Sequence, residues 1–248
     1  MSIYGLIGFP LDHSRSPEWF AGKFAAEGRL NDRYLLFPLE SAEGFRPMLW
    51  REKDLSGLNV TIPHKVAILP YLDELDETAA AVGAVNTIRI RRAEGGIHTK
   101  GFNTDAPAFL ATLERFDLAG PALILGTGGA SRAVAWALKR TGIPYRFVSR
   151  KKDEAGVLTY ADLDAETIAG FRIIINTTPL GMGAWADQCP SLPYSALTPR
   201  HLLYDLIYHP EETLFLRQGR AQGALTLNGR PMLEAQAELA YRIFTAGE

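Results

Sequence analysis

Short apolar runs alternate with amphipathic helical patterns along the whole chain. Several of these runs are apolar on both faces, as is typical of parallel strands covered by helices. They predict strands at residues 4–8, 34–39, 58–61, 122–125, 145–149, 172–176, 202–206 and 224–227. Because strands and helices alternate from one end to the other, the pattern predicts an α/β protein.

Residues that favour caps and turns define the ends of several elements. Residues 16–18, Ser-Pro-Glu, predict an N-cap followed by a proline and an acid in the first helical turn. Gly142 is placed to end a helix that begins near Ser131. Residues 95–96, Gly-Gly, predict a hairpin turn. The acidic run within 73–77 predicts a solvated helix face.

A domain boundary is expected where a new strand–helix–strand unit begins, at residues 118–125. The helix opened by residues 103–105 leads the chain into that unit, which places a first domain at 1–102 and a second from 103. The last helical pattern, at residues 232–244, has no strand after it. If this helix returns to cover the first domain, the domains are 1–102 plus about 228–248, and 103–227.

Composition excludes several classes of protein. The chain has 26 lysines and arginines against 28 acidic residues, a net charge of −2, so it lacks the general phosphate attraction of nucleic-acid binders. No apolar run approaches the roughly 18 residues that span a bilayer, and the N-terminus does not resemble a signal peptide. We therefore expect a cytoplasmic protein.

Metal and thiol chemistry are not expected. The single cysteine, Cys189, cannot form an internal disulfide and leaves no thiolate cluster for a metal. The histidines show no metal-ligand spacing and are interpreted as surface or capping residues: His13, His64, His98, His201 and His209. The expectation is that the protein holds no metal.

The strongest motif lies at residues 122–142, ALILGTGGASRAVAWALKRTG. A buried strand leads into Gly126, Gly128 and Gly129 and then into a helix. Such glycines let the backbone approach a pyrophosphate, and the helix N-terminus supplies N–H groups to bind it. Ser131 replaces the usual third glycine and is small enough to allow close packing. A plain glycine turn is the alternative, but the strand–turn–helix context favours dinucleotide binding.

The end of the next strand indicates which dinucleotide is bound. NAD-specific proteins normally carry an acidic residue here to hold the ribose 2′-hydroxyl. This chain instead has Ser149, Arg150, Lys151 and Lys152. A carboxylate would repel a 2′-phosphate, whereas a guanidinium binds it well, so the loop predicts NADP. The alternative is a solvated basic loop.

The first half carries polar groups at the predicted strand ends. Ser14 and Ser16 follow the first strand and suit a polyol or a carboxylate, although Ser16 could be only a helix cap. Thr61 ends a strand, and Lys65 lies in the first turn of the next helix, where a cation is locally unfavourable. The placement of Lys65 favours a functional role, with an ordinary surface lysine as the alternative.

Two segments with an Asn-Thr pair add further candidates. GAVNT places Asn86 before a predicted strand, and GFNTD places Asp105 at the start of a predicted helix. Asn103 or Thr104 could cap that helix, in which case Asp105 would be only a first-turn acid.

Together these motifs resemble one family, shikimate dehydrogenase. The matching segments occur in the family's order at similar spacing and cover nearly the whole chain: GFPLDHSRSP, NVTIPHK, GAVNT, GFNTD, GTGGASRA, NTTPLGM, YDLIYHPEET and NGRPMLEAQA. The family reversibly reduces 3-dehydroshikimate to shikimate with NADPH in aromatic amino-acid biosynthesis. The resemblance implies a substrate domain and a Rossmann-like NADP domain, with the active site in the cleft between them and the C-terminal helix returning to the first domain.

The resemblance also implies residue roles. Lys65 and Asp105 correspond to the catalytic pair. The substrate carboxylate would be held by Ser14 and Ser16. The ring hydroxyls would be bound by Thr61, Asn86, Asp105, Tyr208 and Gln236. The cofactor would be held by Gly126, Thr127, Gly128, Gly129, Ala130, Ser149, Arg150, Lys151, and the main chain of Leu206 and Gly229.

Three departures from the family pattern remain. Lys151 replaces a common threonine, residues 230–231, Arg-Pro, replace residues that are more often apolar, and residues 180–193 form a short loop of unassigned role. The resemblance implies a monomer or homodimer that binds a small-molecule substrate. Quinate or quinate/shikimate dehydrogenase remains an alternative, as does a dinucleotide-binding regulator without turnover.

Overall fold

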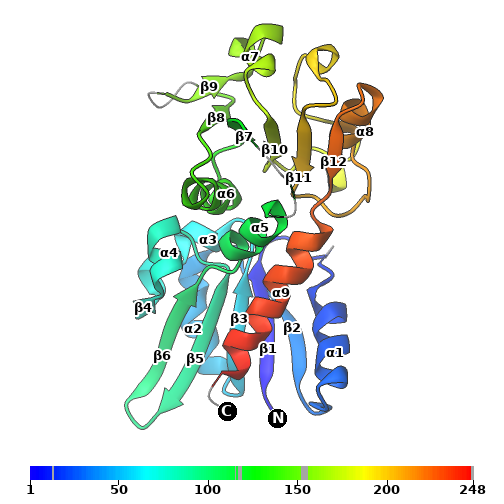
Figure 1. Ribbon diagram of the computed structural model, residues 1–248. Helices are drawn as coiled ribbons and strands as arrows, with labels where there is room; N and C mark the ends of the chain where they lie inside the picture. The colour runs from blue at the N-terminus through cyan, green and yellow to red at the C-terminus, as the bar shows by residue number, and fades with distance from the viewer. Residues whose placement is uncertain (13, 115, 117–118, 152–155, 247–248) are drawn as a thin grey trace. The chain divides into compact units, whose positions relative to one another are not determined.

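The computed structural model describes residues 1–12, 14–114, 116, 119–151 and 156–246 of the chain (Figure 1). The chain divides into two compact units. Unit 1 comprises Met1–Thr104 and Ala235–Glu248, and unit 2 comprises Asp105–Glu234. Each unit is built on a six-stranded sheet with helices packed against it, which confirms the predicted α/β class.

The sheet of unit 1 is mixed. Its strands are β1 (Ile3–Gly8), β2 (Arg33–Pro38), β3 (Leu55–Val60), β4 (Glu74–Leu75), β5 (Thr87–Ala93) and β6 (Gly96–Phe102), in the order β2-β1-β3-β5-β6-β4. β1 is parallel to β2 and β3, whereas β5 is antiparallel to β3 and β6. The carboxyl ends of β1, β3 and β6 and the amino end of β5 therefore lie at the same edge of the sheet.

Helices cover both faces of this sheet. They are α1 (Ser16–Ala26), α2 (Phe45–Arg51), α3 (His64–Ala67), α4 (Glu77–Val82) and the part of α9 (Arg230–Thr245) that belongs to unit 1. Successive residues of β1 point to opposite faces. Tyr4 packs with α1 and α9 residues such as Phe20 and Phe244, and Ile7 packs with α2 residues such as Phe45. Figure 1 shows α9 lying across the strands of this sheet.

The sheet of unit 2 is parallel throughout. Its strands are β7 (Ala122–Leu125), β8 (Tyr145–Ser149), β9 (Leu158–Thr159), β10 (Ile173–Asn176), β11 (Leu202–Asp205) and β12 (Leu225–Leu227), in the order β12-β11-β10-β7-β8-β9. β10, β11 and β12 lie on one side of β7, and β8 and β9 lie on the other. This is the Rossmann order, and the switch between β7 and β10 is where such sheets bind dinucleotides.

The helices of unit 2 are α5 (Asp105–Leu113), α6 (Gly129–Arg140), α7 (Ala165–Ala169) and α8 (Leu214–Ala221). Every residue of β7, β10 and β11 is buried, as expected for strands that are apolar on both faces. Tyr204 of β11 stacks on Phe109 of α5 at 5.0 Å, whereas its neighbour Leu203 packs with Phe215 of α8. The sheet is thus enclosed by helices on both sides.

The eight predicted strands correspond to β1, β2, β3, β7, β8, β10, β11 and β12, and β5 and β6 flank the predicted hairpin turn. Three local predictions differ from the structure. β3 begins at Leu55 rather than residue 58. The hairpin turn consists of residues 94–95, because Gly96 already pairs with Ala93. The prediction that the acidic run within 73–77 forms a helix face holds only for Glu77, the exposed first residue of α4. Glu74 lies in β4, and Asp76 caps α4 by accepting from Ala79 N at 2.8 Å.

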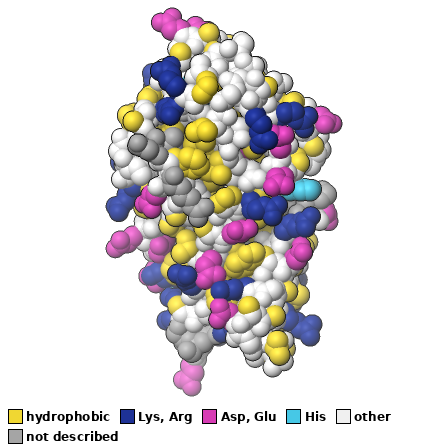
Figure 2. Space-filling view, turned by 45° about the vertical axis from the view of Figure 1, so that its right-hand side comes forward, with side chains coloured by type: hydrophobic (Ala, Val, Ile, Leu, Met, Phe, Trp, Pro, Cys, Tyr) yellow, Lys and Arg dark blue, Asp and Glu magenta, His cyan; other side chains and the backbone are white. Residues whose placement is uncertain are grey.

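Two other local features bear on the sequence analysis. Gly142 has φ +72 directly after the C-cap of α6, so its predicted role in ending that helix is confirmed. Cys189 packs against the core of unit 2, while Trp185 in the same loop is half exposed. None of the helices among the described residues is long and apolar enough to cross a bilayer. On the face shown in Figure 2, basic side chains are interspersed with acidic ones.

Candidate active site

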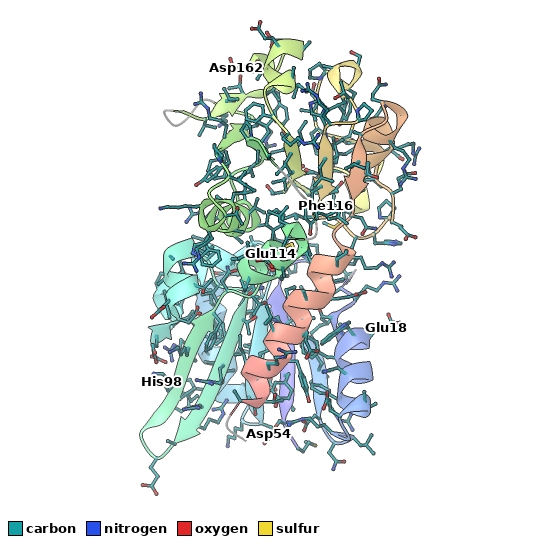
Figure 3. The ribbon with its side chains drawn as sticks, viewed as in Figure 1. Glu18, Asp54, His98, Glu114, Phe116 and Asp162 are labelled. Carbon is teal, nitrogen blue, oxygen red and sulfur yellow. The ribbon has the colours of Figure 1, made fainter. Side chains whose placement is uncertain are left out.

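Two loops of unit 1 run together at the carboxyl edge of its sheet. Thr61 N donates to Ile7 O at 2.9 Å, and Phe9 N donates to Ile62 O at 3.1 Å. These bonds hold the segment after β1, which carries Ser14 and Ser16, next to the segment after β3, which carries Thr61 and Lys65. In Figure 3 this edge lies at the opposite end of the sheet from Asp54, which precedes β3.

The serine pair differs in detail from the sequence prediction. Ser16 is the first residue of α1 rather than its N-cap, because Arg15 already has near-helical angles and occupies the cap position. The prediction of Ser16 as N-cap was therefore wrong. Ser14 Oγ instead accepts from Ser16 N at 3.3 Å.

Lys65 lies in the second position of the short helix α3, on a firmly held backbone. Val85 N donates to Lys65 O at 2.7 Å, one residue before Asn86. The preceding residue, His64, is buried, and its Nε2 is 2.6 Å from Leu39 O. His64 was interpreted as a surface or capping residue, and a surface position is excluded because it is buried. Its ring anchors the helix that carries Lys65.

Asn86 is part of a buried hydrogen-bond network at the same edge. Its Oδ1 accepts from Thr104 N at 2.7 Å, and its Nδ2 donates to Thr104 Oγ1 at 2.9 Å. The amide is therefore fixed in orientation by both ends of its side chain. Thr104 is the last residue before Asp105, which is buried at the start of α5. Asn103 donates its Nδ2 to Ala84 O at 2.9 Å.

Tyr34 and Asn59 also belong to this network and were not predicted from the sequence. Asn59 donates its Nδ2 to Asn86 O at 3.2 Å and to Thr87 Oγ1 at 3.1 Å, and its Oδ1 accepts from the Tyr34 hydroxyl at 2.8 Å. A polar residue at an inward position of an apolar strand was the available signal. The network extends from Tyr34 through Asn59 to Asn86.

The other predicted substrate residues are on separate elements. Gln236 lies in the part of α9 that belongs to unit 1, and its side chain is partly buried. Tyr208 follows β11 in unit 2 and is also partly buried. Asp105 opens unit 2, whereas Lys65 belongs to unit 1.

The glycine loop of unit 2 begins directly after β7, at the switch point of the sheet. Gly126 has φ +112, and a Cβ there would lie 2.7 Å from Thr177 Oγ1, so only glycine fits. Thr177 follows β10, across the switch point, and its hydroxyl donates to Leu125 O at 2.7 Å. At the start of α6, Ser131 is fully buried and donates to Gly128 O at 2.6 Å, so this serine fits the close packing expected of the third glycine.

The basic segment lies beside this loop at the end of β8. Gly126 N donates to Val148 O at 2.9 Å, which ties the glycine loop to the neighbouring strand. Arg150 and Lys151 are exposed, and Lys151 N donates to Ser149 Oγ at 3.3 Å. Lys152, also predicted to belong to this segment, lies outside the described residues. The arrangement offers backbone N–H groups and a guanidinium at the place where the adenosine half of a dinucleotide binds.

Leu206 and Gly229 approach each other closely in unit 2. Gly229 N donates to Ile207 O at 2.9 Å, and a Cβ at Gly229 would overlap Leu206 O. α9 begins at the next residue, so Pro231 falls in the first helical turn, where its missing N–H costs little. The Arg-Pro departure from the family pattern is therefore compatible with this turn.

Of the remaining histidines that the structure describes, one is buried and two are exposed. His201 is buried, and its Nδ1 accepts from Thr198 N at 2.9 Å. His98 and His209 are exposed, and His98 can be followed on β6 in Figure 3. His13 lies outside the described residues. Among the residues that the structure describes, no His, Cys, Asp and Glu side chains are grouped so that they could hold a metal ion.

Residues 6–88 match the family profile described as the shikimate dehydrogenase substrate binding domain. The shikimate dehydrogenase (NADP(+)) of Carboxydothermus hydrogenoformans is 37% identical over 98% of this chain and 91% of the relative. The chain belongs to the shikimate dehydrogenase family. The resemblance inferred from its motifs is thereby confirmed.

Solved structures of the family have the same fold. A shikimate 5-dehydrogenase from Thermus thermophilus, in complex with NADP(H) and shikimate, has a TM-score of 0.84 at 35% identity, covering 99% of this chain and 94% of that one. A quinate dehydrogenase from Corynebacterium glutamicum, in complex with NAD, has a TM-score of 0.83 at 30% identity, covering 98% and 93%. Fold similarity thus does not separate the shikimate dehydrogenases from a quinate enzyme.

Proposed function

We propose that this protein catalyses the reversible reduction of 3-dehydroshikimate to shikimate with NADPH, a step of aromatic amino-acid biosynthesis. The main support is that Ser14, Thr61, Lys65 and Asn86 gather at one sheet edge of unit 1, in a member of the shikimate dehydrogenase family. The Rossmann order and glycine loop of unit 2 support the cofactor assignment.

Unit 1 would bind the substrate and unit 2 the cofactor. Ser14 and Ser16 hold the carboxylate with their hydroxyls, and the two residues are joined by the bond from Ser16 N to Ser14 Oγ at the start of α1. The ring hydroxyls bind to Thr61, Asn86, Asp105, Tyr208 and Gln236. Because its neighbours fix the Asn86 amide, that residue can distinguish the position of a hydroxyl with little loss of side-chain entropy.

Reduction of a ketone requires a hydride on carbon and a proton on oxygen. NADPH supplies the hydride when it is bound, and the protein has to orient it. Lys65 gives a proton from its Nζ to the developing alkoxide and stabilises the negative charge on that oxygen. Asp105 acts on the same hydroxyl. In the oxidising direction Lys65 takes the proton back.

The cofactor is held at three places of unit 2. Residues 126–130 donate backbone N–H groups to the pyrophosphate at the N-terminus of α6. Ser149, Arg150 and Lys151 bind the adenosine ribose and its 2′-phosphate, which favours NADP over NAD. The main chain of Leu206 and Gly229 would lie against the nicotinamide.

Quinate is the competing substrate. It carries an additional hydroxyl beside the carboxylate, so room for it would have to come from the serine pair. Both serines are present here, and the basic segment favours NADP. The quinate dehydrogenase from Corynebacterium glutamicum, by contrast, was solved in complex with NAD. A dinucleotide-binding regulator without turnover would not need Lys65 or Asp105, and their presence favours an enzyme.

One assay tests the function and its alternatives. Formation of reduced nicotinamide is measured with shikimate and with quinate, each with NADP+ and with NAD+. We expect the highest kcat/KM for shikimate with NADP+. Preference for quinate would establish the quinate enzyme, and no turnover with any pair would leave the regulator. A cytoplasmic location and a monomer or homodimer remain part of the proposal, and sedimentation of the purified protein would establish the oligomeric state.

A further inference from the structure

Asp205 is a buried carboxylate that the proposed mechanism does not use. It is the last residue of β11, and no part of it is exposed to solvent. Its carboxylate accepts three hydrogen bonds from neutral donors. Burial of a carboxylate among neutral groups is costly, and here burial raises the pKa of Asp205 to about 6, against the opposing effect of these bonds.

The three donors belong to three different segments. Asp205 Oδ1 accepts from Ile207 N at 3.0 Å, in the turn after β11, and from Asn176 Nδ2 at 3.1 Å, at the end of β10. Asp205 Oδ2 accepts from Thr213 Oγ1 at 2.6 Å, where Thr213 is the N-cap of α8. The Asp205 side chain therefore connects the turn after β11, the end of β10 and the N-terminus of α8.

The Asn176 contact passes this constraint into the loop after β10. Asn176 Nδ2 also donates to Leu180 O at 3.1 Å, and its Oδ1 accepts from Thr178 N at 3.0 Å. On the other side, Ile207 O accepts from Gly229 N at 2.9 Å, next to the close approach of Gly229 to Leu206 O. The backbone positions of the loop after β10, the Leu206 carbonyl and Gly229 thus all depend on contacts to or next to Asp205.

The location of these segments connects them with one half of the cofactor. A dinucleotide crosses the switch point between β7 and β10, with its adenosine half over β7 and β8. The other half then extends over the carboxyl ends of β10 and β11. Asp205 forms hydrogen bonds at both of these strand ends, to Asn176 and to Ile207. A costly buried charge at the ligand-binding edge of such a sheet is more consistent with positioning than with stability alone.

We propose that Asp205 is a positioning residue for the nicotinamide half of NADP(H), acting through the turn after β11 and the loop after β10. The inference rests on the proposed function, because it requires that NADP(H) binds at the switch point of unit 2. Asp205 itself does not have to touch the cofactor. Its role is to hold the Leu206 carbonyl and Gly229 in the geometry that receives the nicotinamide.

The test compares two ligands that share only the adenosine half. NADP+ covers the whole site, whereas adenosine 2′,5′-bisphosphate has the 2′-phosphate but no nicotinamide. For Asp205→Ala we expect the Kd of NADP+, measured by calorimetry, to rise roughly tenfold. The substitution removes the acceptor that holds the turn after β11 and the loop after β10, where the nicotinamide half is proposed to bind. The Kd of adenosine 2′,5′-bisphosphate should stay within about twofold. In turnover, KM for NADP+ should rise while KM for shikimate does not.

Two variants act as matched comparisons. Asp205→Asn keeps an acceptor oxygen for Ile207 N, so NADP+ binding should remain within about threefold of the wild type. Asp164→Asn changes an exposed carboxylate of the same unit that caps α7, and it should affect neither ligand. If Asp205→Ala does not fold, Thr213→Val removes the donor to Asp205 and the cap of α8 at nearly constant shape, and it should weaken only NADP+.

Two results would overturn the inference. Unchanged NADP+ binding by Asp205→Ala would show that the nicotinamide side does not depend on this carboxylate. Equal weakening of both ligands would assign Asp205 to the general stability of unit 2. Wild-type turnover with shikimate and NADP+ separates this from the proposed function: an inactive wild type contradicts the function, whereas an active wild type with an unaffected Asp205→Ala contradicts only the inference.

Discussion

The two units place polar groups at the carboxyl ends of their strands by different means. Unit 1 uses side chains that fix one another, as in the hydrogen bonds from Tyr34 through Asn59 to Asn86. Unit 2 uses backbone, with the glycine loop after β7 and the close approach of Gly229 to Leu206. The carboxylate of Asp205, buried at this edge, bonds loops of its own unit.

The difference follows from the chemistry of the proposed ligands. A polyol presents hydroxyls whose directions have to be read by donors and acceptors on side chains. A pyrophosphate is a diffuse anion that is bound well by backbone N–H groups at a helix N-terminus. Substitutions at the edge of unit 1 should therefore act on the substrate and its turnover, and substitutions at the edge of unit 2 on the cofactor.

The largest effect is expected from Lys65→Met. Loss of a general acid–base group should lower kcat by about 10²–10⁴-fold, with a much smaller change in KM for shikimate, because the contact is strongest in the transition state. Steady-state kinetics measure the split. Lys53→Met, at an exposed lysine of the same unit, is the control and should leave both constants unchanged.

A double substitution shows whether Lys65 shares its task with Asp105. If both act on one oxygen, Lys65→Met with Asp105→Asn should lower kcat by much less than the product of the single effects. Clean multiplication would place the two residues on different parts of the substrate. Near-normal kcat in Lys65→Met alone would contradict the proposed active site.

The next effect concerns stability and pH, and it contrasts one carboxylate of each unit. Burial raises the pKa of Asp205 to about 6, above its value in the unfolded chain. The folded state therefore binds the proton more tightly, so this contribution to the free energy of unfolding falls as pH rises from about 4 to about 6. The change is about 3 kcal/mol. Urea unfolding of wild type and Asp205→Asn at both ends of that window measures it as a difference.

Asp73 of unit 1 should behave in the opposite sense. Burial opposes the change, but hydrogen bonds from Arg46 and Thr99 outweigh it and lower the pKa of Asp73 to about 2. Its contribution to stability is present above about pH 4 and is lost as pH falls toward 2.

If the pH dependence of the stability of Asp205→Asn matched that of the wild type between pH 4 and 6, the Asp205 carboxylate would not carry the raised pKa.

A smaller effect is expected at the basic segment of unit 2. Arg150→Ala should raise KM for NADP+ roughly tenfold and leave KM for NAD+ nearly unchanged, because one charge-assisted contact to the 2′-phosphate is lost. Arg200→Ala removes an exposed arginine of the same unit and serves as the control. Equal changes for both cofactors would mean that Arg150 does not contact the 2′-phosphate.

The smallest effect is expected at Tyr34, behind the substrate edge of unit 1. Tyr34→Phe keeps the stack on Phe20, at 4.2 Å, but removes the donor to Asn59 Oδ1. KM for shikimate should rise by roughly threefold with little change in the Kd of NADP+. Tyr4→Phe removes the phenol that accepts from Arg29 in the same aromatic cluster and should not change KM. An unaltered KM in Tyr34→Phe would separate the network from substrate binding.

The sequence predicted those features that depend on local pattern. The two-faced strands of unit 2 could be identified because nearly all their residues are apolar, and the glycine loop because it follows such a strand directly. β3 was predicted to begin at residue 58, after Ser56 and Gly57, whereas the structure begins it at Leu55. Gly57 pairs with Tyr4 of β1 and Arg89 of β5, and Phe244, far away in sequence, packs directly on it.

The missed features all depend on contacts between distant segments. Tyr34 and Asn59 bond across the sheet, His64 reaches Leu39, and Asp205 connects three segments of unit 2. No spacing rule within one segment could indicate such pairs. The Ser16 cap failed for a local reason, because Arg15 already has near-helical angles and occupies the cap position.

The C-terminal helix has a consequence for how the protein is made. The chain leaves unit 1 after Thr104 and returns at Ala235, and Tyr241 and Phe244 of α9 complete the cluster around Tyr4. During synthesis unit 1 therefore lacks part of its core until the codons of α9 have been read, whereas unit 2 is continuous and is available to fold earlier. A ribosome that stalls before α9 releases an incomplete unit 1 with exposed aromatic rings, which are recognition signals for chaperones and proteases.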